Sequence, residues 1–108
     1  MAKGVEVRDL RVGEGAVAGR RTTVTVRYDG FLRRGDRFQS TTCTFDLSKR
    51  EVIAGLRYGV EGMRVGGLRQ LTVSPHLAYG GAGVPGVIPP DAVLIFEVEL
   101  LDVRPTEA

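Results

Sequence analysis

The chain carries few side chains able to do covalent chemistry, and their spacing assembles no catalytic set. It holds one cysteine and one histidine, Cys43 and His76. Ser74 is too near His76 in sequence for a triad to be assumed, and Pro75 stands between them. No GxSxG, phosphate-loop or HExxH pattern is present. His76 is therefore more typical of a solvated turn than of a general base, and an enzyme built from this chain would use no nucleophile.

The same inventory predicts no metal site and no cofactor. Cys43 has no basic or histidine neighbour in sequence to lower its thiol pKa, so we expect a small apolar filler. A lone cysteine excludes an internal disulfide and a CxxC motif. One cysteine and one histidine would need clustered carboxylates to hold a transition metal, and the carboxylates do not cluster at suitable spacing.

The stretch from Tyr79 to Phe96 is the most unusual part of the chain. Its first part holds four glycines and three prolines, which excludes a helix or a central strand. It nevertheless carries the apolar residues Val84, Val87 and Ile88. A long apolar loop is more often functional than connective, so this stretch could form a shallow hydrophobic binding surface. The alternative is a loop tucked over the core, with these side chains simply buried.

The elements that must position this loop are short strands and one helix. Alternating residues predict strands at 4–13, 22–32, around Phe38, and at 41–47, 68–74 and 93–103. A turn at residues 34–36 precedes the Phe38 strand, and Asp29-Gly30 marks a bulge. On one face we expect two inward-facing sets, Val24, Val26 and Tyr28, and Cys43, Phe45 and Leu47.

A single apolar stripe predicts a short helix near residues 53–60. Ser48 and Glu51 have capping-box spacing before it. The glycines at 55, 59 and 62 each weaken a helix by about 1 kcal/mol where they fall in its interior, so a long helix is not expected. One helix among several strands, without βαβ alternation, predicts an α+β fold in which a bent antiparallel sheet of about five strands wraps the helix.

Composition and charge place the chain among ordinary globular domains. Its 108 residues predict a single domain over 1–108, with 43% hydrophobic residues and 26% charged residues. The net charge of +2, without clustered basic and aromatic residues, disfavours nucleic-acid binding. No apolar run is long enough to span a membrane, and no signal peptide follows Met1. We therefore expect a cytoplasmic monomer.

Several segments of the chain resemble the FKBP-type peptidyl-prolyl cis-trans isomerases. They occur in the order of that family and with nearly its spacing over almost the whole chain. The segments are Val26-Arg27-Tyr28-Asp29-Gly30, Glu51-Val52-Ile53-Ala54-Gly55, Val60-Glu61-Gly62-Met63, Ala78-Tyr79-Gly80, Pro85-Gly86-Val87-Ile88-Pro89-Pro90-Asp91-Ala92 and Leu94-Ile95-Phe96-Glu97-Val98-Glu99-Leu100-Leu101.

The resemblance implies a half-barrel-like sheet around a short helix, with a proline-binding pocket between them. It places Leu56 on the floor of the pocket and Val87 and Ile88 at its lip. The backbone N–H of Ile53 and the hydroxyl of Tyr79 would donate hydrogen bonds to ligand carbonyls. The residues implied to line the pocket walls are Tyr28, Phe38, Gln39, Phe45, Val52, Ile53, Tyr79 and Phe96. Of these, the resemblance assigns the catalytic positions to Phe38, Ile53, Tyr79 and Phe96.

Four features depart from the common pattern of the family. Gln39 stands where an acidic residue is usual, and Leu56 where tryptophan is usual. The segment 39–44 is short, with Cys43 at an often aromatic position, and Val84 replaces a polar or aromatic residue. Binding of X-Pro peptides or unfolded proteins is expected to survive these changes, whereas turnover and affinity for tacrolimus or rapamycin are expected to fall. The competing hypothesis is a catalytically weak binding module or chaperone of the same fold.

Overall fold

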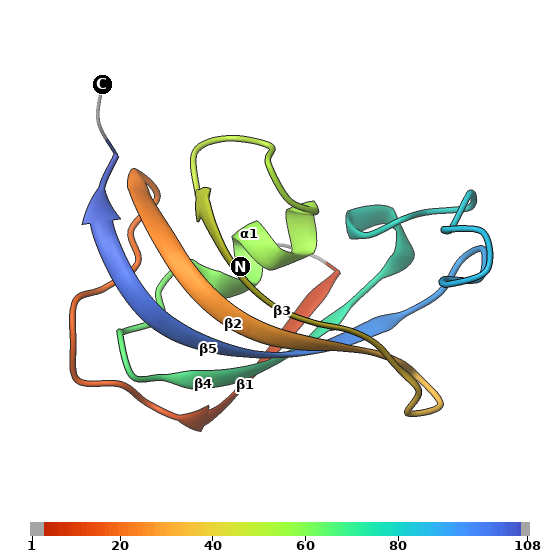
Figure 1. Ribbon diagram of the computed structural model, residues 1–108, viewed down its shortest axis with the longest axis horizontal. Coiled ribbons are helices and arrows are strands. Elements are labelled where there is room, and N and C mark those ends of the chain that lie inside the picture. Colours follow the sequence, from red (N-terminus) through yellow and green to blue (C-terminus); the bar gives the residue numbers. More distant parts are fainter. Residues whose placement is uncertain (1–3, 107–108) are drawn as a thin grey trace.

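The structure is a computed structural model that describes residues 4–106. Five strands form one antiparallel sheet in the order β1-β4-β5-β2-β3, and the sheet curves around the helix α1 (Figure 1). A single 3₁₀ turn, η1 (Pro75–Leu77), precedes the proline-rich loop. The element bounds are β1 Val5–Arg11, β2 Thr22–Leu32, β3 Arg37–Asp46, α1 Ala54–Val60, β4 Leu68–Val73 and β5 Leu94–Pro105. The predicted α+β class and its bent sheet are confirmed.

The inner face of the sheet is built by strict alternation along β2. Val24, Val26 and Tyr28 are buried, whereas Arg27 between them is exposed. β-branched and aromatic side chains suit a pleated surface of which one side is covered, so this segment forms a strand. The register of β2 against β3 shifts between Gly30 and Phe31, next to the predicted bulge. Long pairing with β5 on one side and β3 on the other makes β2 a central strand.

The glycines of α1 let the helix lie directly on β4. A Cβ atom at Gly55 would collide with the side chain of Val73, and one at Gly59 would collide with that of Leu71. Glycine in a helix costs about 1 kcal/mol relative to alanine. That cost is offset here by close packing, which buries Leu56 at 2% exposure against the sheet.

The capping box predicted before the helix is wrong. Ile53 is the N-cap residue of α1, and no side chain caps the helix. Glu51 instead accepts a hydrogen bond from the Asp46 backbone N–H at 2.8 Å. The Ser48 hydroxyl donates to Asp46 Oδ1 at 2.6 Å, so Ser48 and Glu51 stabilise the turn that leaves β3. The same spacing of polar residues suits a helix cap or a turn. Here the hydrogen bonds with Asp46 favour the turn.

The predicted pair of short strands around Phe38 and at 41–47 is a single strand, β3. Its pairing with β2 continues from Asp46 to Gln39 without a break. Polar residues in the middle of β3 favoured an interruption, but β3 is an edge strand and its outward-facing side chains are solvated.

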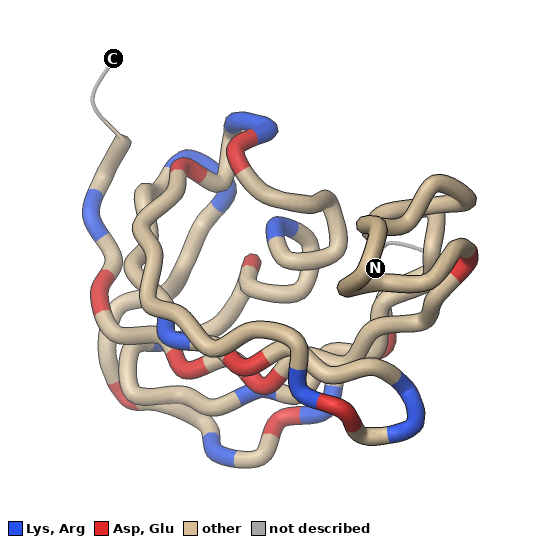
Figure 2. The backbone as a smooth tube through the Cα atoms, turned by 45° about the vertical axis from the view of Figure 1, so that its right-hand side comes forward, with Lys and Arg blue, Asp and Glu red and all other residues tan. Residues whose placement is uncertain are grey.

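Basic and acidic residues are interspersed along the backbone, without one region of a single sign (Figure 2). Glu99 of β5 pairs with Arg11 of β1 and Arg27 of β2, and Asp9 pairs with Arg69 at 2.7 Å. Arg27 and Asp9 thus tie neighbouring strands together, Glu99–Arg11 spans from β5 across β4 to β1, and Arg69 also donates to the Gly59 carbonyl of α1 at 3.0 Å. Within residues 4–106 no helix is long and apolar enough to cross a membrane.

Candidate functional site

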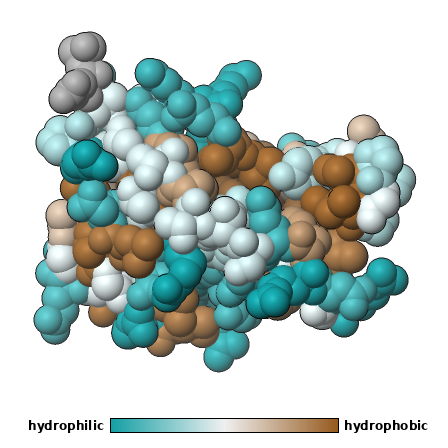
Figure 3. All heavy atoms as spheres, in the orientation of Figure 1, coloured by the Kyte–Doolittle hydropathy of each residue, from teal (hydrophilic) through white to brown (hydrophobic). Residues whose placement is uncertain are grey.

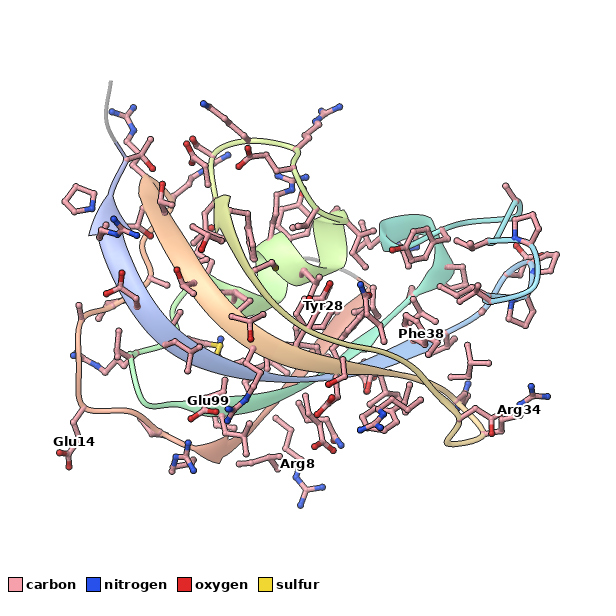
Figure 4. The ribbon with its side chains drawn as sticks, viewed as in Figure 1. Arg8, Glu14, Tyr28, Arg34, Phe38 and Glu99 are labelled. Carbon is pink, nitrogen blue, oxygen red and sulfur yellow. The ribbon has the colours of Figure 1, made fainter. Side chains whose placement is uncertain are left out.

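Three aromatic side chains from three different strands meet on the concave side of the sheet. The ring of Phe96 on β5 lies 5.6 Å from that of Tyr28 on β2 and 6.0 Å from that of Phe38 on β3, measured between centroids. The interplanar angles of 73° and 79° are edge-to-face geometries, which the charge distribution of aromatic rings favours. We call Tyr28, Phe38 and Phe96 the sheet wall; Figure 4 labels Tyr28 and Phe38 on their strands.

Gly30 positions the ring of Phe38 in the sheet wall. A Cβ atom at residue 30 would lie 2.6 Å from Cζ of Phe38 and 3.0 Å from its Cε1. The ring therefore rests on bare backbone at the position where β2 pairs with both Gln39 and Phe96. No other residue type leaves room for this contact, so the glycine predicted to mark a bulge also shapes the site.

The Tyr28 hydroxyl is held at the edge of the sheet wall by Gln39. It donates a hydrogen bond to Gln39 Oε1 at 3.3 Å. Burial raises the pKa of Tyr28 to about 12, with smaller contributions from the nearby Cys43 thiol and Tyr79 phenol. The neutral phenol is therefore the form present at ordinary pH. The amide oxygen of Gln39 accepts this hydrogen bond without bringing a formal charge to the site.

The segment before α1 holds further residues that were predicted for the site. Val52 and Ile53 are partly buried and pack against the core, and Leu56 in the first turn is fully buried. The Ile53 carbonyl accepts hydrogen bonds from the N–H groups of Leu56 and Arg57. Its own N–H donates to no group within residues 4–106. This leaves one backbone donor free beside the helix start.

The proline-rich loop is folded back on itself by backbone hydrogen bonds. Val84 and Ile88 exchange two bonds of 2.8 Å, and Gly83 donates to the Tyr79 carbonyl at 3.0 Å. Ile88 is 5% exposed and acts as the internal anchor, whereas Val87 is 47% exposed. The Tyr79 ring is 37% exposed, and its hydroxyl has no hydrogen-bond partner among the described residues. We call Tyr79, Val84 and Val87 the loop wall.

Two residues on the inner face of β3 lie at different depths. Phe45 is 2% exposed and packs in the core opposite Val24, as deeply buried as Phe96 of the sheet wall at 1%. Cys43 faces the same side of the sheet, is only partly buried, and lies near Tyr28. Burial raises the pKa of the Cys43 thiol, which keeps it neutral and apolar. The alternation of β3 put both residues on the inner face but could not tell which lies beside Tyr28.

The surface between these walls offers apolar contacts and two free hydrogen-bond donors. Within residues 4–106, no three His, Cys, Asp or Glu side chains gather closely enough to hold a metal ion. The donors are the Ile53 N–H and the Tyr79 hydroxyl. Such a surface can hold an apolar ring and bind a carbonyl oxygen beside it.

Comparison with known proteins gives a consistent result. The sequence profile of the FKBP-type peptidyl-prolyl cis-trans isomerases matches residues 15–101. FK506-binding protein 4 of Emericella nidulans is 47% identical over 106 residues, which cover 94% of this chain and 22% of that protein. The FK506-binding protein of Neisseria meningitidis serogroup B is 43% identical over 105 residues, covering 93% and 96% of the two chains. The chain thus spans about a fifth of the larger relative and nearly all of the smaller one.

Two solved structures share the fold. FkpA of Escherichia coli superposes with a TM-score of 0.83 at 36% identity, covering 98% of this chain and 54% of that one. A peptidyl-prolyl cis-trans isomerase of Pseudomonas syringae pv. tomato gives 0.85 at 32% identity, covering 94% and 77%. With the profile matched over residues 15–101 and these relatives alike in sequence and fold, the chain belongs to the FKBP-type peptidyl-prolyl cis-trans isomerase family.

Proposed function

We propose that this chain is a peptidyl-prolyl cis-trans isomerase whose substrate binds between the sheet wall and the loop wall. The observation that carries the proposal is the edge-to-face cluster of Tyr28, Phe38 and Phe96, which gathers three aromatic rings on the concave side of the sheet, where an apolar proline ring could bind. The free donors of Ile53 and Tyr79 complete the site. Family membership supports the same activity.

The geometry suits a reaction that makes and breaks no covalent bond. The barrier to rotation about a peptide bond is about 18–20 kcal/mol and comes from amide resonance. A twisted amide is less charge-separated than a planar one, so an apolar site favours it over the planar ground state. Stabilising it by about 5–8 kcal/mol would accelerate rotation about 10⁴- to 10⁶-fold. Neither a nucleophile nor a general base is needed.

The roles of the remaining site residues follow from their positions. Phe38 and Phe96 hold the proline ring, and Cys43 extends the apolar surface beside Tyr28. Leu56 forms the floor, with Val52 beside it and Phe45 supporting the sheet from the core. Val87 and Ile88 form the lip, Val87 contacting the ligand and Ile88 anchoring the loop. Tyr79 and Ile53 donate to carbonyls that flank the X-Pro bond.

The wider biology is also a proposal. Relatives named as FK506-binding proteins support binding of tacrolimus and of rapamycin, with lower affinity here because Leu56 is not a flat aromatic floor. We propose that residues 1–108 act as one domain, as a cytoplasmic monomer that assists folding of proline-containing chains. A relative from Spodoptera frugiperda is named as a nuclear protein, so a nuclear location is the competing assignment. Chaperone-like binding of unfolded chains would use the same apolar surface.

Two-dimensional NMR exchange on a short X-Pro peptide tests the activity. Catalytic amounts of the protein are expected to speed exchange far above the uncatalysed rate, which has a time constant of about tens of seconds or longer. Saturable peptide shifts without faster exchange would make the chain a binding module and overturn the proposal. The Gln39→Asp variant, run beside a Gln70→Asp control, measures what a charged acceptor for Tyr28 adds. Gln70 lies on β4, which β5 separates from the strand of Tyr28, so this control adds the same charge away from the Tyr28 hydroxyl.

A further inference from the structure

The outer edge of β3 is an unpaired strand edge beside the proposed site. β3 is the last strand of the sheet order, so its far side has no neighbouring strand. Tyr28 pairs with Thr41 of β3, so this edge lies about one strand spacing, 4.8 Å, beyond the backbone of the sheet wall. Phe38 and Gln39 lie on the same strand.

The register identifies which backbone groups point outward. Leu47 donates to the Thr22 carbonyl at 3.0 Å, which makes 22 and 47 a hydrogen-bonded pair. Such pairs alternate along an antiparallel ladder, so the odd-numbered residues of β3 from 39 to 45 bond to β2. The N–H and C=O groups of Ser40, Thr42 and Thr44 therefore point away from the sheet. The Asp46 N–H points the same way and is already occupied by Glu51.

These outward groups are free within residues 4–106, apart from one weak local contact. The Thr41 hydroxyl donates to the Thr42 carbonyl at 3.4 Å. No other hydrogen bond involves the backbone of Ser40, Thr42 or Thr44 on this side. Each of the three side chains is exposed, so nothing covers the edge.

The segment Ser40–Thr44 of β3 lacks the features that protect the other edge of the sheet, because the register shift of β3 lies outside it, at Phe38. β1 carries Glu6, Arg8, Asp9 and Arg11 and has a register irregularity between Asp9 and Arg11. Charged residues and bulges of this kind discourage pairing with another chain. Between Arg37 and Asp46, β3 carries no charge and no proline, and it appears as an unbroken tan stretch in Figure 2. Figure 3 shows pale, near-neutral side chains across the same region.

We propose that an extended segment of the client polypeptide adds to β3 as a sixth strand along Ser40–Thr44, while its proline occupies the neighbouring site. This rests on the proposed function and extends it to client selection. Main-chain pairing recognises an extended uncharged segment of any sequence, which suits an enzyme for unfolded chains. Three outward residues match a client segment of about five residues. A contact of that length is too small for a stable dimer, which needs about 1,200 Å² or more.

The test compares peptide affinity and turnover in one protein and two variants. The peptides are a tetrapeptide with one X-Pro bond and the same peptide extended by five Thr or Val residues on either side. We expect one extension to lower Kd about tenfold, the effect of roughly two net hydrogen bonds. Thr42→Pro removes the central outward N–H while leaving the ladder to β2 intact, as an edge position allows. It should abolish this gain and leave tetrapeptide turnover unchanged, whereas Thr42→Ala should preserve the gain.

A second measurement keeps the protein intact. Alternate amides of the peptide extension are N-methylated in two peptides, one for each alternating set. Methylation of the set that faces β3 should abolish the gain in affinity, and methylation of the other set should preserve it. An extension that never lowers Kd, or a gain that survives Thr42→Pro, overturns the strand pairing. Sedimentation could instead show a concentration-dependent dimer that Thr42→Pro dissociates. That result would assign the edge of β3 to a second copy of this chain and would also overturn the proposed pairing with a client. If the unmodified protein does not accelerate exchange in the tetrapeptide, the isomerase proposal is refuted instead. The strand-pairing proposal is still tested in that case, because the Kd comparison measures binding at the edge of β3 independently of turnover.

Discussion

The sheet wall and the loop wall of the site are held by different forces. Phe96 is 1% exposed and Tyr28 is 6% exposed, and both are positioned by strand pairing and core packing. Tyr79 and Val87 are 37% and 47% exposed, and their loop is held by its own backbone hydrogen bonds. The first wall is therefore part of the fold, and the second is an attachment to it. Substitutions in the two walls should separate stability from activity.

The largest effect is expected for Phe96→Ala, because it removes the ring shared by both aromatic contacts. Loss of a buried phenylalanine typically costs about 3–5 kcal/mol of unfolding free energy. Turnover should fall even in protein that remains folded. Leu100→Ala on the same strand is the control, since Leu100 is equally buried and pairs with Val26, outside the sheet wall. Denaturant unfolding measures the folded fraction of each variant, and NMR exchange measures its turnover. Equal loss of turnover in both variants at matched folded fractions would contradict a special role for Phe96.

Gly83→Ala should break the loop wall while largely sparing the fold. Gly83 has φ of +61°, and an added Cβ would collide with the Ile88 carbonyl that Val84 uses to close the loop. Gly86→Ala is a matched control, because Gly86 also has positive φ, +77°, but nothing lies within 4 Å of its added Cβ. Both variants bear the backbone strain of about 1–2 kcal/mol. Only Gly83→Ala should weaken peptide binding strongly; equal binding by both would mean that loop closure does not shape the site.

The contrast between the walls also separates what the sequence predicted well from what it did not. The strand alternation of β2 and β4 and the position of α1 were predictable because burial imposes a period on the residues. The contact of Phe38 with Gly30 was not, because it depends on how β2 and β3 pair and on the register shift beside Gly30. The turn made by Asp46, Ser48 and Glu51 was mistaken for a helix cap because both use the same residue types.

The site shows the same limit. The resemblance named Phe45 as a lining residue, and the sequence neighbours of Cys43 predicted a small apolar filler. Both residues lie on the inner face of β3, Phe45 deep in the core and Cys43 partly buried near Tyr28. Periodicity gives the face of a strand but not the depth of each residue along it. The depth is set by how far the sheet bends, which no local pattern of residues encodes.

Tyr79→Phe should change turnover modestly and stability hardly at all. The variant loses a hydroxyl that has no partner among residues 4–106, so the folded state loses no internal hydrogen bond. Losing one hydrogen bond to a substrate carbonyl predicts a fall in kcat/KM of about 2- to 10-fold. Tyr58→Phe on α1 is the control, because Tyr58 is similarly exposed and lies outside both walls. An unchanged kcat/KM in Tyr79→Phe would remove this hydroxyl from the site.

The smallest effect is an alkaline destabilisation that arises from Tyr28 in the sheet wall. Its pKa in the folded state is raised to about 12, chiefly by burial, above the value of about 10 for an unfolded chain. The folded state thus binds this proton more tightly than the unfolded state does. The resulting stabilisation is complete below about pH 10 and is lost as the pH rises towards 12. Tyr28→Phe should flatten the fall in unfolding free energy over this range, measured by denaturant unfolding at a series of pH values. An equal slope in the protein and its Tyr28→Phe variant would show that the phenol ionises as readily in the sheet wall as in water.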